Sequence, residues 1–399
     1  MDMETAFVSI LCCALQGRPL IPVDEGQFAS LLDRADQQHL FGMISEKLAE
    51  DPVFCSSALF ERALQKNVRH AMEQKRRDIA FFSLYRAMEE KGLQPLVMKG
   101  MACRNAYGEL GRLRPSGDED LLVRPQDFEK ACQVLLAEGY ETGKALKTIV
   151  PQTVHHVVFQ KNGGYTVELH VRPMGVEKPF LQQMDRYFDD AFARAVSFEY
   201  QGHRLYTLGP SDHYLLLIFH AAKHFMGQGF GVRLLADMAM FCQYYGRDIC
   251  LADVEKALKD CRLYPFYSDM VHLANRELGF SLPEAEKTVC PDVLRREMLK
   301  SGVFGERNIN NILATIATVA NIRYEKKGKA LWHMLFPARE TVLIAHPEWK
   351  DKPLKRWMHY PKRWGKAARL VLFKGQASPL QSLRLSRERL QLMKRYGMQ

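Results

Sequence analysis

The sequence contains no CxxC pair, although nine cysteines are scattered along its 399 residues. An odd number of cysteines without paired spacing argues against both a zinc ribbon and a disulfide framework. No apolar run reaches about 18 residues, which is close to the length that a membrane-spanning helix needs. Internal repeats and low-complexity tracts are missing as well. These absences predict a globular protein with reduced thiols, and we expect it to be cytoplasmic.

The stretch AFVSILCCAL near the N-terminus resembles the apolar core of an export signal, but its flank has the wrong charge. Asp2 and Glu4 precede it, and no lysine or arginine does. Export signals instead begin with positive charge. We therefore expect this stretch to belong to the folded protein.

Positive charge is concentrated at one end of the chain. The formal net charge is +10, and residues 351–399 hold 13 Lys or Arg against 2 Asp or Glu. The rest of the chain is therefore close to neutral. Two segments of this region, RWMHYPKRW and KAARLVLFK, mix cations with aromatic and apolar residues. Their composition is typical of a solvated helical end, or of a surface for a polyanion such as RNA or an anionic membrane.

The hydropathy pattern divides the chain into four parts. Residues 1–92 carry apolar side chains at intervals of three and four, which predicts a helical region that ends at Gly92. Residues 93–209 switch to short apolar segments and turn signals, which predicts an α+β core with a mixed β-sheet and flanking helices. Residues 210–345 are predicted to be helical again, and 346–399 form the basic tail.

The core segment contains a definite order of expected elements. A strand PLVMKG leads into a helix-length segment MACRNAYGEL, and a second strand DEDLLV leads into an amphipathic helix RPQDFEKACQVLLAEGY. The strands HHVVFQ and YTVELHV flank the turn KNGG, which predicts a β-hairpin. A second hairpin is expected around Gln201 and Gly202.

Three acidic residues stand at the start of the predicted strand DEDLLV. Because side chains alternate along a strand, Asp118 and Asp120 share one face and Glu119 points to the other. A third carboxylate, Glu168 in YTVELHV, joins them if the two strands are neighbours. Two carboxylates about 7 Å apart along a strand suit a divalent cation, Mg²⁺ or Mn²⁺, which also binds phosphate oxygens. Asp118, Asp120 and Glu168 are therefore the predicted metal ligands and catalytic residues, and two bound ions would activate a hydroxyl and stabilise leaving pyrophosphate.

A phosphate-binding turn is predicted just before these acids. Lys99 and Gly100 end one strand and open a helix, where free backbone N–H groups and a glycine let a phosphate approach. Arginines that follow would add positive charge. His170 shares the predicted face of Glu168, so it is a candidate to contact the nucleotide or the acceptor, with an ordinary core histidine as the alternative. The predicted nucleotide-binding residues are Lys99, Gly100, Arg112, Arg114, Ser116 and His170.

The ordered motifs resemble a known family. MKGMACRNAYGELGRLRPSGDEDLLV followed by VELHVRP is similar to the uncharacterised nucleotidyltransferase family of the DNA polymerase beta-like superfamily, strongly over 93–172 and weakly through the flanking helices. The resemblance implies Mg-dependent transfer of a nucleotidyl group from a nucleoside triphosphate to an unidentified hydroxyl-bearing acceptor: a small molecule, a protein or RNA. It implies that Asp118, Asp120 and Glu168 bind the metal. Gly100 matches the glycine-led turn, and Arg114 matches the arginine before the acid pair.

Three positions depart from the family pattern. The turn is Lys-Gly-Met, Glu119 replaces a residue that is generally apolar, and Glu168 stands where aspartate is commoner. Two alternatives therefore stay open. One is a catalytically degenerate nucleotide-binding or regulatory protein, and the other is a toxin-like nucleotidyltransferase that acts on RNA.

Several further residues have the right chemistry for a site but weaker signals. His220 and His224 in HAAKH have the i, i+4 spacing of zinc ligands. They lack the glutamate of HExxH, which favours a helix surface or interface role. His155 and His156 fall on the strand next to that of His170. Asp237 in LLADMAM is expected to be an ordinary helix acid, with support of the site as the second reading.

Overall fold

The computed structural model describes these parts of the chain: 1–144, 146, 149, 154–175, 179–227, 229–285, 287–300 and 390–398. They fall into two compact units, one made of Met1–Ala222 with Val232–Pro291 and the other of Lys223–Gly231 with Asp292–Gln399. The predicted end of the helical region after 300, and the basic tail up to 389, lie outside the described residues.

The N-terminal region is helical, as predicted. Helix α1 (Met3–Gln16) begins at Asp2, whose carboxylate accepts the Thr5 N–H at 3.0 Å, and it ends at Gly17 with a φ of 60°. The apolar stretch that resembles an export signal forms this helix, and most of its side chains are buried. Helices α2 (Phe28–Gln37), α3 (Phe41–Leu48) and α4 (Pro52–Cys55) follow.

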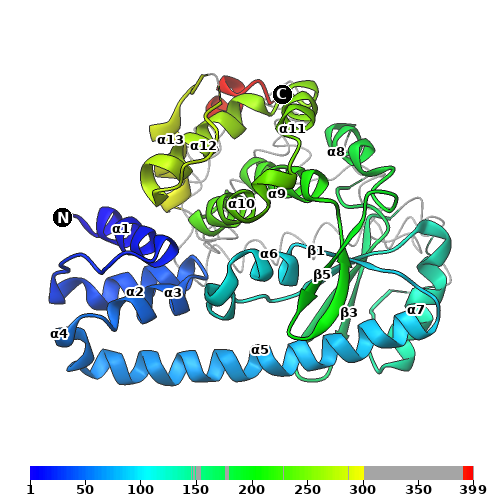
Figure 1. The fold of residues 1–399 in the computed structure, drawn as a ribbon, viewed down its shortest axis with the longest axis horizontal. Coiled ribbons are helices and arrows are strands. Elements are labelled where there is room, and N and C mark those ends of the chain that lie inside the picture. Colours follow the sequence, from blue (N-terminus) through cyan, green and yellow to red (C-terminus); the bar gives the residue numbers. More distant parts are fainter. Residues whose placement is uncertain are drawn as a thin grey trace, which may run out of the picture. The chain divides into compact units, whose positions relative to one another are not determined.

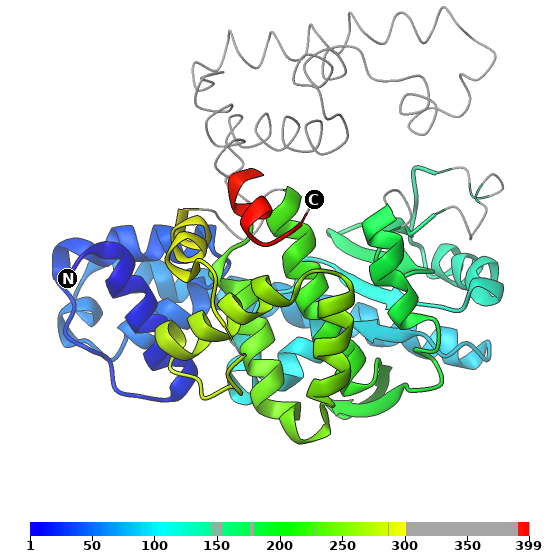
Figure 2. The ribbon, with the colours of Figure 1, turned by 90° about the horizontal axis from the view of Figure 1, so that it is seen from above.

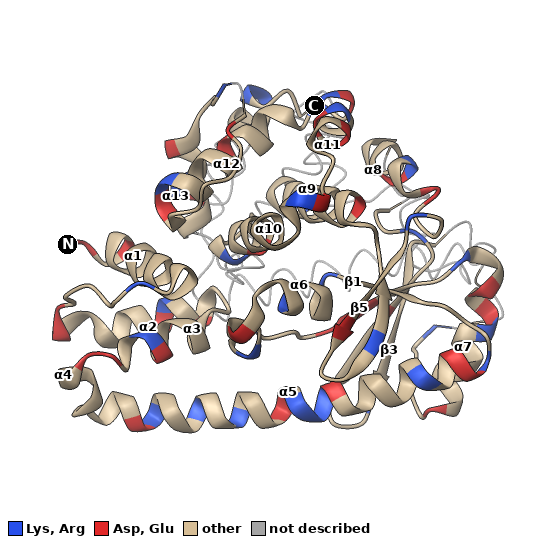
Figure 3. Ribbon diagram, viewed as in Figure 1, with Lys and Arg blue, Asp and Glu red and all other residues tan. Residues whose placement is uncertain are grey.

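Helix α5 (Ala58–Glu90) has 33 residues, which corresponds to about 50 Å at 1.5 Å per residue. It ends just before Gly92, whose φ of 72° is a left-handed value that suits glycine. Figures 1 and 2 show α1–α4 gathered near the start of α5 and the sheet near its end. Acidic and basic residues are spread along the visible length of α5 (Figure 3). This helix therefore spans the unit with a solvated face and a face that packs against the sheet.

Six strands form one mixed sheet, which confirms the predicted α+β class. The strand order is β3-β4-β2-β1-β6-β5. Both expected hairpins, β3–β4 and β5–β6, are antiparallel, while β2 pairs with β4 and β1 with β6 in parallel. The strands are β1 (Leu96–Met98), β2 (Glu119–Leu122), β3 (His156–Lys161), β4 (Tyr165–His170), β5 (Val196–Tyr200) and β6 (His203–Thr207).

One face of the sheet is apolar and covered by helices. Val97, Leu121 and Leu169 pack there with Phe81 of α5 and Leu135 of α7 (Phe128–Ala137). The alternation predicted for YTVELHV is therefore confirmed, because Val167 and Leu169 are buried in this core. Side chains of the intervening positions, including Asp120 and Glu168, point to the other face.

The segment between β1 and β2 contains two short helices rather than one regular α-helix. Helix α6 (Gly100–Ala106) is followed by the 3₁₀ helix η2 (Gly108–Leu113), and α6 contacts α10 (Val232–Tyr245). The other labelled helices are α8 (Pro179–Asp185), α9 (Pro210–Gly227), α11 (Leu251–Asp260), α12 (Tyr264–Leu278) and α13 (Pro291–Lys300). None of the described helices is long and apolar enough to cross a membrane.

The second unit has an aromatic cluster among its described residues. Phe225 meets Phe230 edge to face, with ring centroids 6.2 Å apart, and meets Tyr396 at 5.9 Å. The side chain of Tyr396 is almost completely buried. These contacts join residues at the two ends of this unit's sequence.

Candidate active site

The parallel pairing of β2 with β4 brings two of the predicted metal ligands together. Asp120 lies directly opposite Glu168 in the strand register. Asp118 comes immediately before β2, and its pKa is raised, first by burial and then by the nearby Asp120 carboxylate. A charged neighbour changes a pKa in this way only at short range. The structure thus brings the three predicted acids together, two of them at the start of β2 and the third on the neighbouring β4.

Asp120 is the centre of the polar contacts at this end of the sheet. Its Oδ1 lies 3.0 Å from Lys99 Nζ and 2.8 Å from His170 Nε2. Burial alone would raise the pKa of Asp120, but the Lys99 charge and the His170 bond hold it below its usual range. Asp120 is therefore ionised and buried, with Lys99 as its charge partner.

Glu168 shares the same histidine. His170 Nε2 lies 3.3 Å from Glu168 Oε2. Burial acts to raise the pKa of Glu168, but the His170 bond together with the charges of His156 and His170 lowers it. His170 is buried, yet its pKa is raised by its contacts with Asp120 and Glu168. Sequence reasoning placed His170 on the face of Glu168, and the structure confirms that position.

The backbone of Lys99 adopts an unusual conformation, with φ 50° and ψ −115°. A non-glycine residue in this region carries strain that the surrounding structure must hold. His213 at the start of α9 provides one such restraint, because its Nε2 accepts the Lys99 backbone N–H at 3.0 Å. Thr207 fixes the ring from the other side: its Oγ1 donates to Val97 O at 2.6 Å and lies 3.0 Å from His213 Nδ1.

These contacts define the protonation of His213. The Thr207 hydroxyl donates its single proton to Val97 O, so toward His213 it can only accept. His213 therefore carries its proton on Nδ1, and its Nε2 is the acceptor for the Lys99 N–H. Burial, together with the Lys99 charge, lowers the pKa of His213 to about 3, which keeps the ring neutral. His213 thus positions Lys99 toward Asp120, a role that no local sequence signal indicated.

Glu119 occupies the beginning of α6, where the sequence predicted a phosphate. Its Oε2 accepts the Met101 N–H at 3.2 Å. A Cβ on Gly100 would lie only 2.1 Å from this oxygen, so glycine is required for the close approach of the carboxylate. The contribution of Gly100 to phosphate binding stays a prediction, and its observed partner is Glu119.

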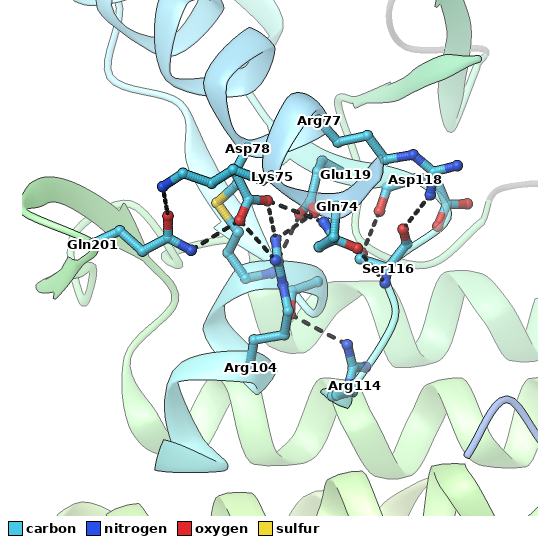
Figure 4. Close-up of polar contacts among 12 residues, drawn as sticks. Gln74, Lys75, Arg77, Asp78, Arg104, Arg114, Ser116, Asp118, Glu119 and Gln201 are labelled. Carbon is cyan, nitrogen blue, oxygen red and sulfur yellow. Dashed lines mark hydrogen bonds and ion pairs between the residues drawn. The ribbon is translucent and has the colours of Figure 1, made fainter. Parts of the chain in front are cut away.

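Glu119 also belongs to a buried ion network, shown in Figure 4. Arg104 of α6 donates to both oxygens of Asp78 on α5, at 3.1 and 2.9 Å, and to Glu119 Oε1 at 3.1 Å. Gln74 and Gln201 donate to Asp78 as well. Burial raises the pKa of Glu119 to about 7, although the Arg104 charge acts in the opposite direction. The acid that departs from the family pattern thus connects α5, α6 and β2.

Arg114 forms a second buried pair. Its Nε and Nη2 donate to Asp237 of α10 at 2.7 and 2.8 Å, and Tyr107 Oη donates to the same carboxylate at 2.9 Å. The second reading of Asp237, as an acid that supports the site, agrees with this position. The charge of Arg233, also on α10, contributes to the lowered pKa of Asp237 and opposes the rise in the pKa of Asp118. The predicted nucleotide contact of Arg114 stays a prediction, and its observed partner is Asp237.

The remaining predicted residues lie in different surroundings. Arg112 is exposed and pairs with Glu46 of α3. Ser116 Oγ donates to Asp118 O at 2.9 Å, and its backbone contacts Gln74 and Arg77 of α5. Ser116 thus shapes the turn that precedes Asp118, whereas the structure does not bring Arg112 to Asp120.

A small pocket opens beside Asp118. Arg77, Ser116 and Gly117 line one part of it, and Tyr140 and Tyr165 line another.

The described residues contain two sets of three side chains whose ligand atoms lie within 4.8 Å of one another. One is Asp120, Glu168 and His170, and the other is His155, His156 and His170. Neither set includes His220 or His224. Carboxylate oxygens are the ligands that Mg²⁺ and Mn²⁺ prefer, so the buried Asp120 and the half-buried Glu168 fit a divalent ion. The positions of Asp118, Asp120 and Glu168 are consistent with their predicted metal role, which stays a prediction.

A mixed sheet that carries acids at the start of β2 and on the neighbouring β4, after a strand–turn–helix, is consistent with a nucleotidyltransferase fold, the class that the motifs indicated. The sequence profile of the uncharacterised nucleotidyltransferase family matches residues 24–279, which is more than half of the chain. The protein therefore belongs to the uncharacterised nucleotidyltransferase family. Comparisons with curated proteins and with solved structures found no match.

Proposed function

We propose that this protein transfers a nucleotidyl group from a nucleoside triphosphate to a hydroxyl-bearing acceptor, with Mg²⁺ or Mn²⁺ as the cofactor. Membership of the nucleotidyltransferase family supports the general reaction. The observation that carries the proposal is the register of β2 and β4, which sets Asp120 opposite Glu168 beside Lys99. Asp118, Asp120 and Glu168 are the residues that would hold the ion. When bound, it would supply charge stabilisation for the triphosphate and the leaving pyrophosphate.

The chain's own groups have separable tasks in this proposal. Lys99 keeps Asp120 ionised and offers a positive charge next to the acids, where the triphosphate would lie. Glu168 is less buried than Asp120, and its pKa is lowered, so it is ionised and accessible. It can accept the proton of an acceptor hydroxyl, a contribution of roughly 10²–10⁴-fold to the rate, or serve as the third metal ligand.

Triphosphate binding tests the proposal directly. We expect a nucleoside triphosphate with Mg²⁺ to raise the thermal stability of the full chain, by about 2.7 kcal/mol at 100 times its dissociation constant. Each triphosphate is measured with and without Mg²⁺ by differential scanning fluorimetry. Equal stabilisation with and without the ion would contradict the metal role and favour the non-catalytic alternative. Incubation with labelled triphosphate and RNA then tests the toxin-like alternative.

Other expectations from the sequence stay predictions. They are the division at residues 92, 209 and 345, the cytoplasmic location and a polyanion surface in 346–399. Loss of binding to RNA or anionic vesicles at low salt after deletion of 351–399 is the result that would support the last of these.

A further inference from the structure

Both ring nitrogens of His170 face oxygen atoms. Nδ1 lies 3.3 Å from Arg172 O, and Nε2 lies 2.8 Å from Asp120 Oδ1 and 3.3 Å from Glu168 Oε2. A backbone carbonyl only accepts, so the Arg172 contact requires a proton on Nδ1. Nε2 then faces two carboxylates, and this contact is favourable only with a cation on that nitrogen. The cation is either a second proton or a metal ion.

The surroundings of His170 match those of a metal-binding histidine. Such histidines commonly donate the N–H of one ring nitrogen to a backbone carbonyl and bind the ion through the other nitrogen. Two ligand atoms bound to one ion at about 2.1 Å each lie roughly 3–4 Å apart, close to the distances around Nε2. Asp120, Glu168 and His170 therefore need only small side-chain shifts to hold one ion.

The charges at this end of the sheet also favour a dication. Asp118, Asp120 and Glu168 are three carboxylates, and Lys99 is the cation that contacts one of them directly. Arg233 moderates Asp118 at longer range. An ion on His170 Nε2 would add positive charge between the two carboxylates that already approach this nitrogen.

The surroundings of Glu168 contain more imidazole nitrogen. His156 pairs with His170 across the β3–β4 register, their ring centroids are 5.0 Å apart, and His156 Nε2 lies 3.8 Å from Glu168 Oε2. His155 Nδ1 lies 2.8 Å from His156 Nδ1. Imidazole suits first-row transition metals, whereas Mg²⁺ favours oxygen ligands and water. A site with a buried nitrogen ligand is therefore selective among divalent ions.

We propose that Asp120, Glu168 and His170 Nε2 bind a first-row transition-metal dication more tightly than they bind Mg²⁺. This inference rests on the proposed function for the use of the ion, but the binding itself does not require that function. It changes the predicted role of His170 from a nucleotide contact to a direct metal ligand. It also assigns Arg172 O the task of fixing the tautomer that exposes Nε2.

Metal binding to the full chain, without nucleotide, is the test. Free Mn²⁺ is measured by electron paramagnetic resonance during titration of the protein, and Mg²⁺ is then added as a competitor. Co²⁺ is titrated separately, because its visible absorption reports nitrogen ligands. We expect Mn²⁺ to bind more tightly than Mg²⁺, and His170→Gln to weaken Mn²⁺ binding at least about tenfold with little change for Mg²⁺.

His203→Gln is the matched control, since His203 is an exposed histidine of the same sheet, on β6. We expect it to bind Mn²⁺ as the wild-type protein does. Far-UV circular dichroism shows whether His170→Gln is folded. If it is not, the wild-type Co²⁺ spectrum decides: bands typical of nitrogen coordination support the proposal, and a spectrum of oxygen ligands alone overturns it.

Two results would overturn the proposal. One is equal affinity of the wild-type protein for Mn²⁺ and Mg²⁺, and the other is unchanged Mn²⁺ affinity in folded His170→Gln. Either would leave His170 as a proton-carrying partner of Asp120. If either result is found and the protein still transfers a nucleotidyl group with Mg²⁺, the proposed function stands and the metal proposal fails. If the protein binds Mn²⁺ as expected but triphosphates have no effect, the metal site stands and the proposed function fails.

Discussion

Replacement of Arg104 by methionine is expected to destabilise the protein strongly. Arg104 is 1% exposed, and its two partners, Asp78 and Glu119, are 1% and 6% exposed. Methionine keeps much of the volume but removes the positive charge. Loss of one partner from a buried ion network typically costs about 3–5 kcal/mol, because the other charges remain buried without compensation. Gln74 and Gln201 still donate to Asp78 in the variant, so we expect about 3 kcal/mol.

The loss of stability in Arg104→Met should depend on pH, and the protonation of Glu119 sets the direction of this dependence. Its pKa is raised to about 7 in the folded wild-type protein, above its ordinary value of 4.5. Without Arg104 this pKa rises further, so the folded variant retains a proton that the unfolded chain releases. The folded state then binds more protons than the unfolded state above pH 7, and stability falls as pH rises, by at most about 1.4 kcal/mol per pH unit. The destabilisation relative to wild type should therefore be larger at pH 8 than at pH 6.

Urea denaturation followed by circular dichroism measures both effects. Arg86→Met is the control, because Arg86 is on α5, the helix of Asp78, but the side chains of its pair with Glu90 are 81% and 63% exposed. Such a surface pair contributes less than about 1 kcal/mol. Arg104→Met with Glu119→Gln should recover part of the loss, since one unpaired carboxylate is removed. A cost for Arg104→Met as small as that of Arg86→Met would refute the reasoning.

Four further changes test the site. Asp120→Asn should abolish the stabilisation of the protein by triphosphate that depends on Mg²⁺, and an unchanged metal effect in thermal melts would contradict its role as a ligand. Glu168→Gln keeps the size of the side chain and removes its charge, so we expect triphosphate binding to be retained and transfer to fall roughly 10²-fold or more; transfer at the wild-type rate would point to another base. Gly100→Ala places a methyl group on the Glu119 carboxylate, which should lower the stability by about 1–3 kcal/mol in urea titrations, and a neutral effect would show that Glu119 moves freely. His213→Phe removes the acceptor of the Lys99 N–H and should cost about 1–3 kcal/mol, whereas stability equal to wild type would mean that Lys99 holds its conformation alone.

The order and type of the elements that form the site could be predicted from the amino-acid sequence. The α+β class, both hairpins and the long helix before Gly92 follow from patterns that are local in the chain: the periods of apolar residues, turn dipeptides and glycines. The sharing of one face by Glu168 and His170 is equally local, because it depends only on alternation along β4. These features could be predicted because each depends only on residues that lie close together in the sequence.

The pairing of the buried charged side chains could not be predicted, because it depends on how the elements pack together. Asp78 meets Arg104 across 26 residues and Arg114 meets Asp237 across 123, and no local pattern records such pairings. A buried charge must find an opposite charge wherever the packed elements bring one, so its partner depends on the placement of α5, α6 and α10 around the sheet. For the same reason, the sequence pattern predicted that a phosphate approaches Gly100, whereas in the folded chain the carboxylate of Glu119 lies against this glycine.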